Sequence, residues 1–503
     1  MEINLQSWLS MLNLRTVLLC MSLLLALRWL LGRPRKLPPG PWGMPLLGSA
    51  PAIAAGMLTG TEPKRLFRRY AAKYGPVFHI QILNKDVVVL NDYASVREAF
   101  QHPQLNDRPN MLLPKLFKSS GVAMTSGEPW VELRRFCLTV LRSFGVGKSS
   151  FEDKIATESE ELVKEFAALD GQPFDPKRLL SVAISNIICS VIFGKRYEYA
   201  DEEFKELLHL LGRNFQLMGA GGAVNFFPSL RHLPVVPTAE ILANFEAIRT
   251  FLSRVVDDHR RDFDGVNAND FTDVYLMEIN NNRAKAEAGG GQNHLTERNF
   301  VGTVANLFAA GSETTATTLQ WCLLYMAVYP DVQRRVQDEI DAVVGRNRLP
   351  RMADKPELNF TRAVIWEVQR MTTVVPLGVP HASASDVTFR DFVIPKGALL
   401  MPNLWAISRD PEVWTEPDDF RPSRFLDKAG KASLADELIP FSTGRRSCIG
   451  EHLAKMELFI FFTYFLHQFT FKVPDDSPPP TLEGKGGLTN APVPFQVCPI
   501  RRQ

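Results

Sequence analysis

Apolar residues recur with a helical spacing along most of the chain, and β-strand patterns are few. Residues 77–90 contain two runs of strand-forming residues separated by polar residues 84–86, which predicts a hairpin. Short strands are also predicted at residues 387–394 and 493–498. Helices are predicted at residues 130–141, 156–168, 204–212, 239–262, 299–329, 331–344, 360–371 and 450–467. The pattern therefore predicts a mainly α fold with a small β portion.

Two stretches lack a regular pattern and are predicted to be surface irregularities. Residues 218–234 are rich in glycine and phenylalanine, and residues 280–293 contain the runs NNNR and GGGQ. We expect the second stretch to be mobile and dispensable for function. The sequence has no internal repeat and no long low-complexity tract, so the body is interpreted as one large globular unit.

The N-terminal segment departs most from the average composition. Residues 11–31 are apolar except for Asn13, Arg15, Thr16, Ser22 and Arg28, and a helix of about 20 such residues can span a bilayer. The cations within residues 33–36 act as a stop-transfer signal, and no small-x-small site precedes them, which disfavours a cleaved secretory signal. We predict a single-pass membrane anchor over residues 1–32, a basic, proline-rich spacer over residues 33–48, and a cytosolic body.

Charge and cysteine content narrow the functional classes. The chain of 503 residues carries 57 basic and 55 acidic side chains, a net charge of +2, so we expect no nucleic-acid partner. Its 6 cysteines are scattered and form no C-x-x-C pair. This arrangement is typical of neither a disulfide framework nor a zinc module.

Residues 441–450, with the sequence FSTGRRSCIG, place a cysteine directly before a predicted helix. Cys448 would lie at the positive end of that helix and near Arg446, and both would lower the pKa of the thiol and favour a thiolate. A thiolate can ligate iron, whereas a lone cysteine is more often buried and inert. Gly444 and Gly450 would let the backbone turn sharply and approach a flat macrocycle.

The spacing F-x-x-G-x-R-x-C-x-G of this segment resembles the cysteine-ligand loop of the cytochrome P450 superfamily. The resemblance implies haem b, iron protoporphyrin IX, as the cofactor and Cys448 as the axial ligand of its iron. It further implies that Arg446 pairs with a haem propionate and that Phe441 shields the sulfur from water. The fold implied is of the cytochrome P450 type, with a single haem-thiolate catalytic domain over residues 49–503.

Residues 310–315, AGSETT, match the oxygen-binding groove that the family writes as [AG]-G-x-[DE]-T-[TS]. Threonines are awkward in a helix because their hydroxyls can bond the carbonyls of the preceding turn and bend it. The resemblance implies that Ala310 and Gly311 leave room for dioxygen and that Glu313 and Thr314 relay protons to it. Taken alone, the segment would be interpreted as a Thr-rich packing helix.

Two further matches concern charged residues on helices. Glu367 and Arg370 share one helical face, which is usually only a surface pair. In the family this pair is buried and joined by an arginine of a later loop, here Arg424, and all three are expected to be structural.

The second match is W-x-x-x-R at Trp130 and Arg134, which resembles the helix whose side chains bond a haem propionate. By similar position, Arg108 and His381 are expected to be further propionate partners. As isolated residues, both would be interpreted as ordinary surface groups.

Three segments resemble the microsomal animal branch, the family 2 type that oxidises drugs, steroids and fatty acids: LPPGPWGMPLLG, AGSETT and GEHLAKMELFIFF. The resemblance implies an enzyme of the endoplasmic reticulum membrane, with its catalytic domain on the cytosolic side. Its electrons would come from NADPH through cytochrome P450 reductase, with cytochrome b5 as a further partner, since the chain has no flavin fingerprint.

The expected reaction inserts one oxygen atom of O2 into a lipophilic substrate. By similarity, the substrate pocket is expected to include Ala310, Val375, Val379 and Leu488. Competing interpretations are a haem-thiolate isomerase or dehydratase, a haem sensor or carrier without turnover, and a membrane-tethered scaffold without a cofactor. The intact acid and threonine of the AGSETT segment argue against the first two, and the cysteine loop argues against the third.

Overall fold

The structure, a computed structural model, describes residues 16–23, 36–41, 43–44, 46–116, 120–146, 149–233, 236–287 and 294–502. Residues 16–23 are helical, and the rest of the predicted membrane segment lies outside the described residues. Within the described part of the chain, no helix is both long and apolar enough to cross a bilayer. The membrane anchor therefore stays a prediction.

Part of the predicted spacer packs on the body. The backbone N–H of Val393 donates to the carbonyl of Lys36 at 2.7 Å, and that of His79 donates to Pro39 at 2.8 Å. A Cβ at Gly40 would lie 1.8 Å from the carbonyl oxygen of His79. Only glycine therefore allows this close approach, and the proline-rich segment runs along the body instead of standing apart from it.

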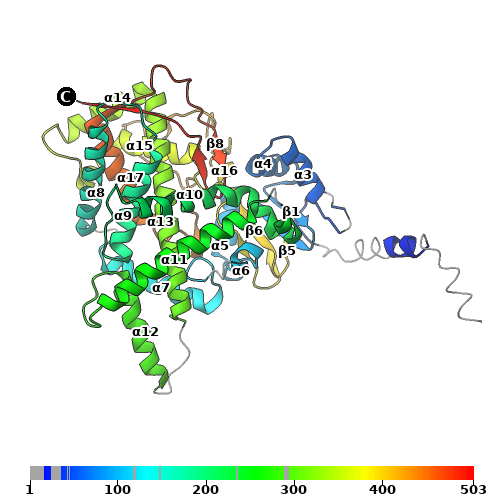
Figure 1. Cartoon of the computed structure of the whole chain (residues 1–503). Coiled ribbons are helices and arrows are strands. Elements are labelled where there is room, and N and C mark those ends of the chain that lie inside the picture. Colours follow the sequence, from blue (N-terminus) through cyan, green and yellow to red (C-terminus); the bar gives the residue numbers. More distant parts are fainter. Residues whose placement is uncertain are drawn as a thin grey trace, which may run out of the picture.

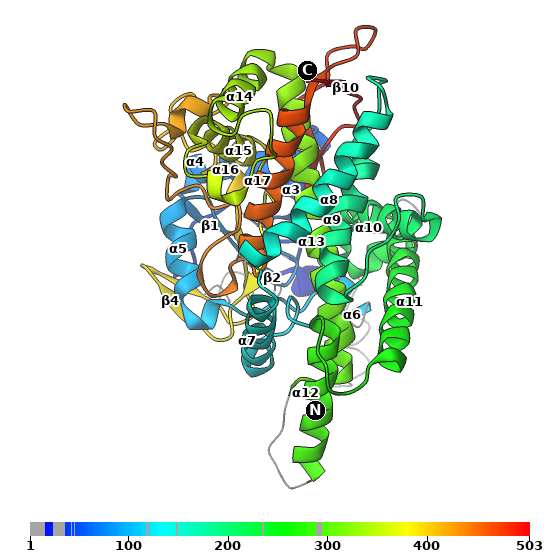
Figure 2. The ribbon, with the colours of Figure 1, turned by 90° about the vertical axis from the view of Figure 1, so that its left-hand side faces the viewer.

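A long central helix, α13 (Glu297–Val328), organises the helical core. The side chain of Thr296 caps its first turn by accepting from the N–H of Asn299, and Pro330 follows directly after its C-cap residue. Helices α9 (Lys177–Ile192) and α17 (Glu451–Gln468) lie alongside it (Figure 2). All three are buried over most of their length, as their largely apolar sequences predict.

The remaining long helices surround this core (Figures 1 and 2). They are α7 (Gly127–Ser143), α8 (Ser149–Ala168), α10 (Glu202–Gly221), α11 (Thr238–Asp262), α12 (Phe271–Glu287), α14 (Pro330–Val343) and α15 (Asn359–Thr372). Shorter helices are α3 (Ala50–Leu58), α4 (Pro63–Tyr74), α5 (Tyr93–Gln101), α6 (Leu112–Leu116) and α16 (Leu404–Ile407).

A small sheet lies to one side of the helical body (Figure 1). Its strand order is β1 (Val77–Ile82), β2 (Lys85–Leu90), β6 (Leu399–Pro402) and β3 (His381–Ala382), and only the β2–β6 pair is parallel. Alternate residues of β1 and β2 enter two different apolar clusters, because successive side chains of a strand point to opposite faces. The sheet thus lies between two small apolar cores, one on each of its faces.

Three two-stranded ribbons complete the β structure. They pair β4 (Val387–Phe389) with β5 (Phe392–Ile394), β7 (Phe469–Lys472) with β10 (Cys498–Arg501), and β8 (Gly484–Gly486) with β9 (Asn490–Pro492). The mainly α prediction is confirmed, as is the hairpin at residues 77–90. The predicted single strand at 387–394 is a hairpin, and the strand predicted at 493–498 is wrong except at its last residue.

The two predicted irregular stretches have different outcomes. Helix α10 continues to Gly221, so the prediction of an irregular stretch from residue 218 is wrong at its start. Residues 222–225 and 228–232 form short 3-10 helices, and that part of the chain is irregular. Helix α12, however, continues to Glu287 through the NNNR run, and the prediction of a loop from residue 280 is wrong there. Residues 288–293 lie outside the described residues.

Candidate active site

The cysteine loop is a tight turn that leads into α17. The N–H of Cys448 donates to the carbonyl of Phe441 at 3.0 Å, which closes the loop around a 3-10 turn, η6 (Gly444–Arg446). Gly444 has φ +77°, and a Cβ there would lie 2.3 Å from the carbonyl oxygen of Phe100. The glycine of the motif is therefore required both by its backbone angle and by its contact with α5.

The surroundings of Cys448 oppose the ionisation of its thiol. Its side chain is accessible to solvent, and yet burial raises the pKa of the thiol. The N–H of Gly450 and the guanidinium of Arg134 oppose that rise. The prediction that Arg446 makes the thiol acidic is wrong, because burial outweighs the nearby charges and the cation acting on the sulfur is Arg134. A thiol of this kind ionises when a metal cation displaces its proton.

Arg446 points away from the cysteine into a cluster of cations. Its Nε donates to the carbonyl of Asn106 at 2.8 Å and its Nη2 to that of Thr125 at 2.7 Å. Its Nη1 is buried and has no hydrogen-bond partner among the described residues. The guanidinium lies 4.0 Å from the centroid of the Trp130 ring. One donor of a buried cation is thus left for a group outside the chain.

Arg108 is held in the same cluster by backbone carbonyls. Its Nε donates to Ala123 at 2.9 Å, and its Nη1 donates to Val379 at 3.1 Å and to Pro380 at 2.8 Å. Burial, and next the charge of Arg134, lower the pKa of Arg108 to about 10. The shift is too small to discharge a guanidinium at neutral pH, so the cluster keeps its positive charge.

Arg134 and His381 complete this arrangement. Arg134 Nη2 donates to the carbonyl of Ser447 at 2.7 Å, which joins α7 to the cysteine loop. The Nδ1 of His381 lies 3.1 Å from the carbonyl oxygen of Leu105. Burial, and then Arg108, lower the pKa of His381 to about 3, so its imidazole is neutral at physiological pH.

The cluster suits a group with two negative charges. Among the described residues, the hydrogen-bond acceptors of the three guanidiniums are carbonyl oxygens and one hydroxyl, with no carboxylate. Buried positive charge without a bonded anion is costly unless a ligand supplies one. The residues present therefore fit the two propionates of haem. The structure brings together the predicted partners Arg108, Trp130, Arg134, His381 and Arg446.

The threonines of α13 bond the preceding turn, as the sequence predicts. Thr314 Oγ1 donates to the carbonyl of Ala310 at 2.8 Å, and Thr318 Oγ1 donates to that of Thr314 at 2.8 Å. Ala310 is exposed in the middle of a helix that is otherwise largely buried. The turn from Ala310 to Thr314 thus presents a small side chain and a backbone-bonded hydroxyl on its accessible side.

Gly311 lies where α13 packs against α9. A Cβ at this position would lie 2.4 Å from the Cδ1 of Ile188 on α9. The glycine therefore allows α13 and α9 to pack closely, and this contact accounts for the missing side chain. The implied role of Gly311 in leaving room for dioxygen stays a prediction.

Glu313 and Thr314 are not hydrogen-bonded to each other. The Glu313 carboxylate accepts from Thr317 Oγ1 at 3.4 Å, and it faces Lys177 at the start of α9. Burial raises the pKa of Glu313, and the charge of Lys177 partly offsets this rise. The lysine was not predicted, because it lies far from the AGSETT segment in sequence.

The buried ion-pair group brings Glu367, Arg370 and Arg424 together. Arg370 Nε and Nη2 donate to the two carboxylate oxygens of Glu367 at 2.7 and 2.8 Å, and Arg424 Nε donates to one of them at 3.0 Å. The backbone N–H of Arg421 also donates to Glu367, at 2.8 Å. The group fixes α15 to the short 3-10 turn η5 (Pro422–Phe425).

The residues predicted for the substrate pocket differ in their exposure to solvent and in their backbone hydrogen bonds. Val379 is 47% exposed, and its carbonyl accepts from Arg108. Val375 and Leu488 are half-buried, and the N–H of Leu488 donates to the carbonyl of Phe215 on α10 at 2.8 Å. Val379 thus lies directly beside the cation cluster.

Sequence reasoning missed the backbone groups that position the arginines. The N–H of Ala123 donates to Asn306 Oδ1 of α13 at 3.0 Å, and so the segment that holds Arg108 and Arg446 is tied to the central helix. No motif signals carbonyl oxygens of this kind.

Comparisons with known proteins agree with the fold and with this site. A mainly helical body with an arginine cluster beside a cysteine loop defines a haem-dependent oxidoreductase. The family model described as cytochrome P450 matches residues 38–499. The chain therefore belongs to the cytochrome P450 family, whose members bind haem b and act as monooxygenases.

The relatives cover nearly the whole chain. Human cytochrome P450 2U1 is 39% identical over 512 residues, which cover 97% of this chain and 93% of the relative. Human cytochrome P450 2J2 is 38% identical over 474 residues, with coverage of 93% and 92%. Cytochrome P450 18a1 of Drosophila melanogaster is 37% identical over 495 residues, with coverage of 96% and 90%.

Proposed function

We propose that the chain is a microsomal haem-thiolate monooxygenase. It inserts one oxygen atom of O2 into a lipophilic organic substrate, a xenobiotic, a steroid or a fatty acid, with electrons that NADPH supplies through a reductase. The observation that carries the proposal is the unpartnered, buried Nη1 of Arg446 in a cation cluster next to the loop of Cys448. The microsomal relatives support the electron source and the location.

Cys448 would hold the haem iron through its thiolate in this proposal, and the cation cluster would hold the propionates. Arg446 and Arg108 would neutralise the propionates, while Trp130 and His381 offer uncharged contacts beside them. Arg134 bonds the backbone of Ser447 and lies near the sulfur, so it supports the ligand loop and the negative charge of the thiolate. When bound, the haem supplies dioxygen activation, with electron donation from the thiolate.

Phe441 limits access of water to the sulfur. Its carbonyl accepts the N–H of Cys448, which keeps the phenylalanine at the entrance of the loop. The ammonium of Lys455 lies 5.5 Å from the centroid of its ring. A low-polarity ring beside the sulfur favours a constant ligand strength.

Thr314 and Glu313 deliver protons in two separate steps. The Thr314 hydroxyl donates to Ala310 on the accessible side of α13, from which it can accept a proton and pass one on. Glu313 is buried, its pKa is raised, and it faces Lys177, so it suits the uptake of protons at the other side of the helix. Rotation of the Glu313 side chain or a water molecule would connect the two groups.

Apolar side chains would hold the substrate. Ala310, Val375, Val379 and Leu488 offer no charged group, and this composition favours a lipophilic molecule. Gly311 contributes to the site by letting α13 pack on α9, which sets the position of Ala310.

The proposed domain organisation follows the sequence analysis. Residues 1–32 anchor the chain in the endoplasmic reticulum membrane, residues 33–48 form the spacer, and residues 49–503 form the catalytic domain on the cytosolic side. NADPH–cytochrome P450 reductase is the proposed electron donor, with cytochrome b5 as a second one.

Turnover of the reconstituted protein tests this function. The full chain would be combined with reductase, NADPH and isotopically labelled O2, and lipophilic metabolites would be screened by mass spectrometry. The proposal predicts a product that carries one labelled oxygen atom and that requires NADPH. A product formed equally without NADPH and O2 would indicate an isomerase or dehydratase, and haem binding without any product would indicate a sensor or carrier.

A further inference from the structure

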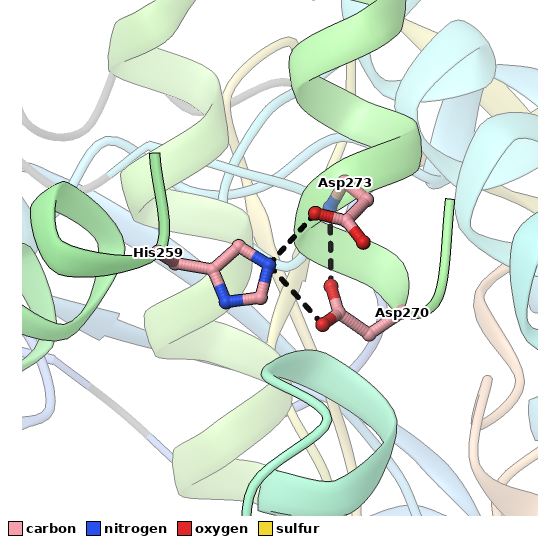
Figure 3. Close-up of side chains that lie close together, drawn as sticks. All are labelled: His259, Asp270 and Asp273. Atoms are coloured by element: carbon pink, nitrogen blue, oxygen red, sulfur yellow. Dashed lines mark hydrogen bonds and ion pairs between the residues drawn. The ribbon is translucent and has the colours of Figure 1, made fainter. Parts of the chain in front are cut away.

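Three potential metal ligands converge at the start of α12, outside the haem site. Figure 3 shows His259, from the last turn of α11, pointing between Asp270 and Asp273. Its Nε2 lies 2.8 Å from Asp273 Oδ1 and 3.2 Å from Asp270 Oδ2. One ligand atom from each of the three residues lies within 4.8 Å of the other two.

The helix start holds both carboxylates in place. Asp270 Oδ1 accepts from the N–H of Asp273 at 3.1 Å, and Asp273 Oδ2 accepts from the N–H of Asn269 at 2.8 Å. Each aspartate therefore uses one oxygen to bond the backbone and directs the other toward His259. A Cβ at Gly194 would lie 3.0 Å from Asp270 Oδ2, so the chain after α9 closes one side of the group. Ligands fixed in this way by outer hydrogen bonds are typical of metal sites.

Two buried carboxylates share one imidazole at this position, and the other groups bonded to them are backbone N–H groups of the helix start. Asp270 and Asp273 are 2% and 3% exposed, and in the described part of the chain neither forms a salt bridge with a lysine or arginine. A single imidazolium leaves one of the two buried negative charges uncompensated. A divalent cation with a neutral imidazole would compensate both.

We propose that His259, Asp270 and Asp273 bind a divalent transition metal ion, for which Zn²⁺ is the best match. One nitrogen and two oxygen ligands suit zinc, and a water molecule would be the fourth ligand. Tetrahedral zinc bonds place ligand atoms about 3.4 Å apart, so the imidazole would move outward by a few tenths of an ångström. The His259 side chain is 20% exposed, which leaves a path for the ion from solvent.

Zinc binding would compete with the proton on His259. A zinc ion binds the imidazole nitrogen only in its unprotonated form, so zinc affinity should increase with pH. The bound ion would join the end of α11 to the start of α12, across residues 263–269.

Calorimetric titration of the haem-loaded full chain with Zn²⁺, after removal of metals by a chelating resin, tests the proposal. We expect one zinc site whose affinity increases as the pH rises. His259→Ala and Asp273→Asn should weaken this site about 10- to 100-fold or more. The matched control is His209→Ala, which removes an exposed histidine of α10 and should leave the affinity unchanged.

Two results would overturn the proposal. One is equal zinc affinity in the parent and in both site variants, which would place the ion at an adventitious surface site. The other is the absence of a zinc site in the parent, which would leave the group as a proton-bridged helix cap. Because a variant can fold poorly, hydrogen exchange of the parent provides an independent measurement. Zinc should protect the amides of residues 257–275, and unchanged exchange there would also contradict the proposal.

Discussion

The buried ion-pair group of Glu367 allows a sharp prediction of stability. Its carboxylate and the Arg370 side chain are 0% exposed, and the Arg424 side chain is 6% exposed. Substitution of Glu367 by glutamine keeps the size of the side chain and removes its charge. The new amide group would present N–H donors to the Nε of Arg370, which now donates to Oε2 at 2.7 Å.

The expected loss follows from these contacts. One charge-assisted hydrogen bond disappears, at about 1.5–3 kcal/mol, and two buried guanidiniums lose their counter-charge. Removal of one partner from a buried ion pair typically costs about 3–5 kcal/mol. We therefore expect Glu367→Gln to lower the free energy of unfolding by about 3–5 kcal/mol.

Urea unfolding of the haem-loaded protein, followed by tryptophan fluorescence and by the haem spectrum, measures this loss. The control is Glu161→Gln, which breaks the exposed ion pair between Glu161 and Lys164. These two residues are three positions apart in sequence, as Glu367 and Arg370 are, and Lys164 Nζ lies 2.7 Å from Glu161 Oε1. That change should cost less than about 0.5 kcal/mol. The reasoning is that burial of an ion pair, and not the pair itself, determines how much free energy of unfolding is lost when the pair is broken. Equal unfolding midpoints for the two variants would refute it.

Three further changes test the site and its surroundings. Thr314→Ala should keep haem but divert electrons to hydrogen peroxide, measured as product per NADPH, whereas Thr318→Ala, which removes a similar backbone-bonded hydroxyl, should stay coupled. Arg446→Leu should speed haem transfer to an acceptor globin about 10- to 100-fold, whereas the exposed Arg445 should tolerate the same change. The pKa of His259 in the folded chain is about 9, above its ordinary 6.5. Protonated His259 therefore contributes fully to the free energy of unfolding below pH 6.5, and this contribution is lost as the pH rises through 9. With a chelator present, the parent should lose about 1–2 kcal/mol of stability over that range, and His259→Ala should not.

Much of the helical core was predictable, because its sequence periodicity is strong. The segments that became α13, α15 and α17 were predicted to within a few residues of their observed ends. Helix α9 was missed because it is apolar on nearly all sides and lacks an amphipathic period. Helix α12 was not predicted at all, and its last turns were predicted to be a loop because asparagines usually interrupt helices. A contact at its start, from Thr272 Oγ1 to the carbonyl of Ile192, helps to hold this helix.

The candidate site was predictable at positions where a sequence motif specifies the residue type. The spacing of Cys448 and Arg446 could be recognised in the sequence, and the structure places the arginine in a buried cation cluster. The direction of the Glu313 carboxylate and the reason for Gly311 could not be predicted, since both depend on the approach of α9. A helix contact of this kind involves residues more than a hundred positions away in sequence.

The spectrum of the reduced protein with carbon monoxide tests the central claim most directly. If the sulfur of Cys448 is the axial ligand, the purified chain should show the shifted Soret band of thiolate ligation, and Cys448→His should show the unshifted band of a histidine-ligated haem. An unshifted band in the parent, or a shifted band that survives the substitution, would contradict thiolate ligation by Cys448.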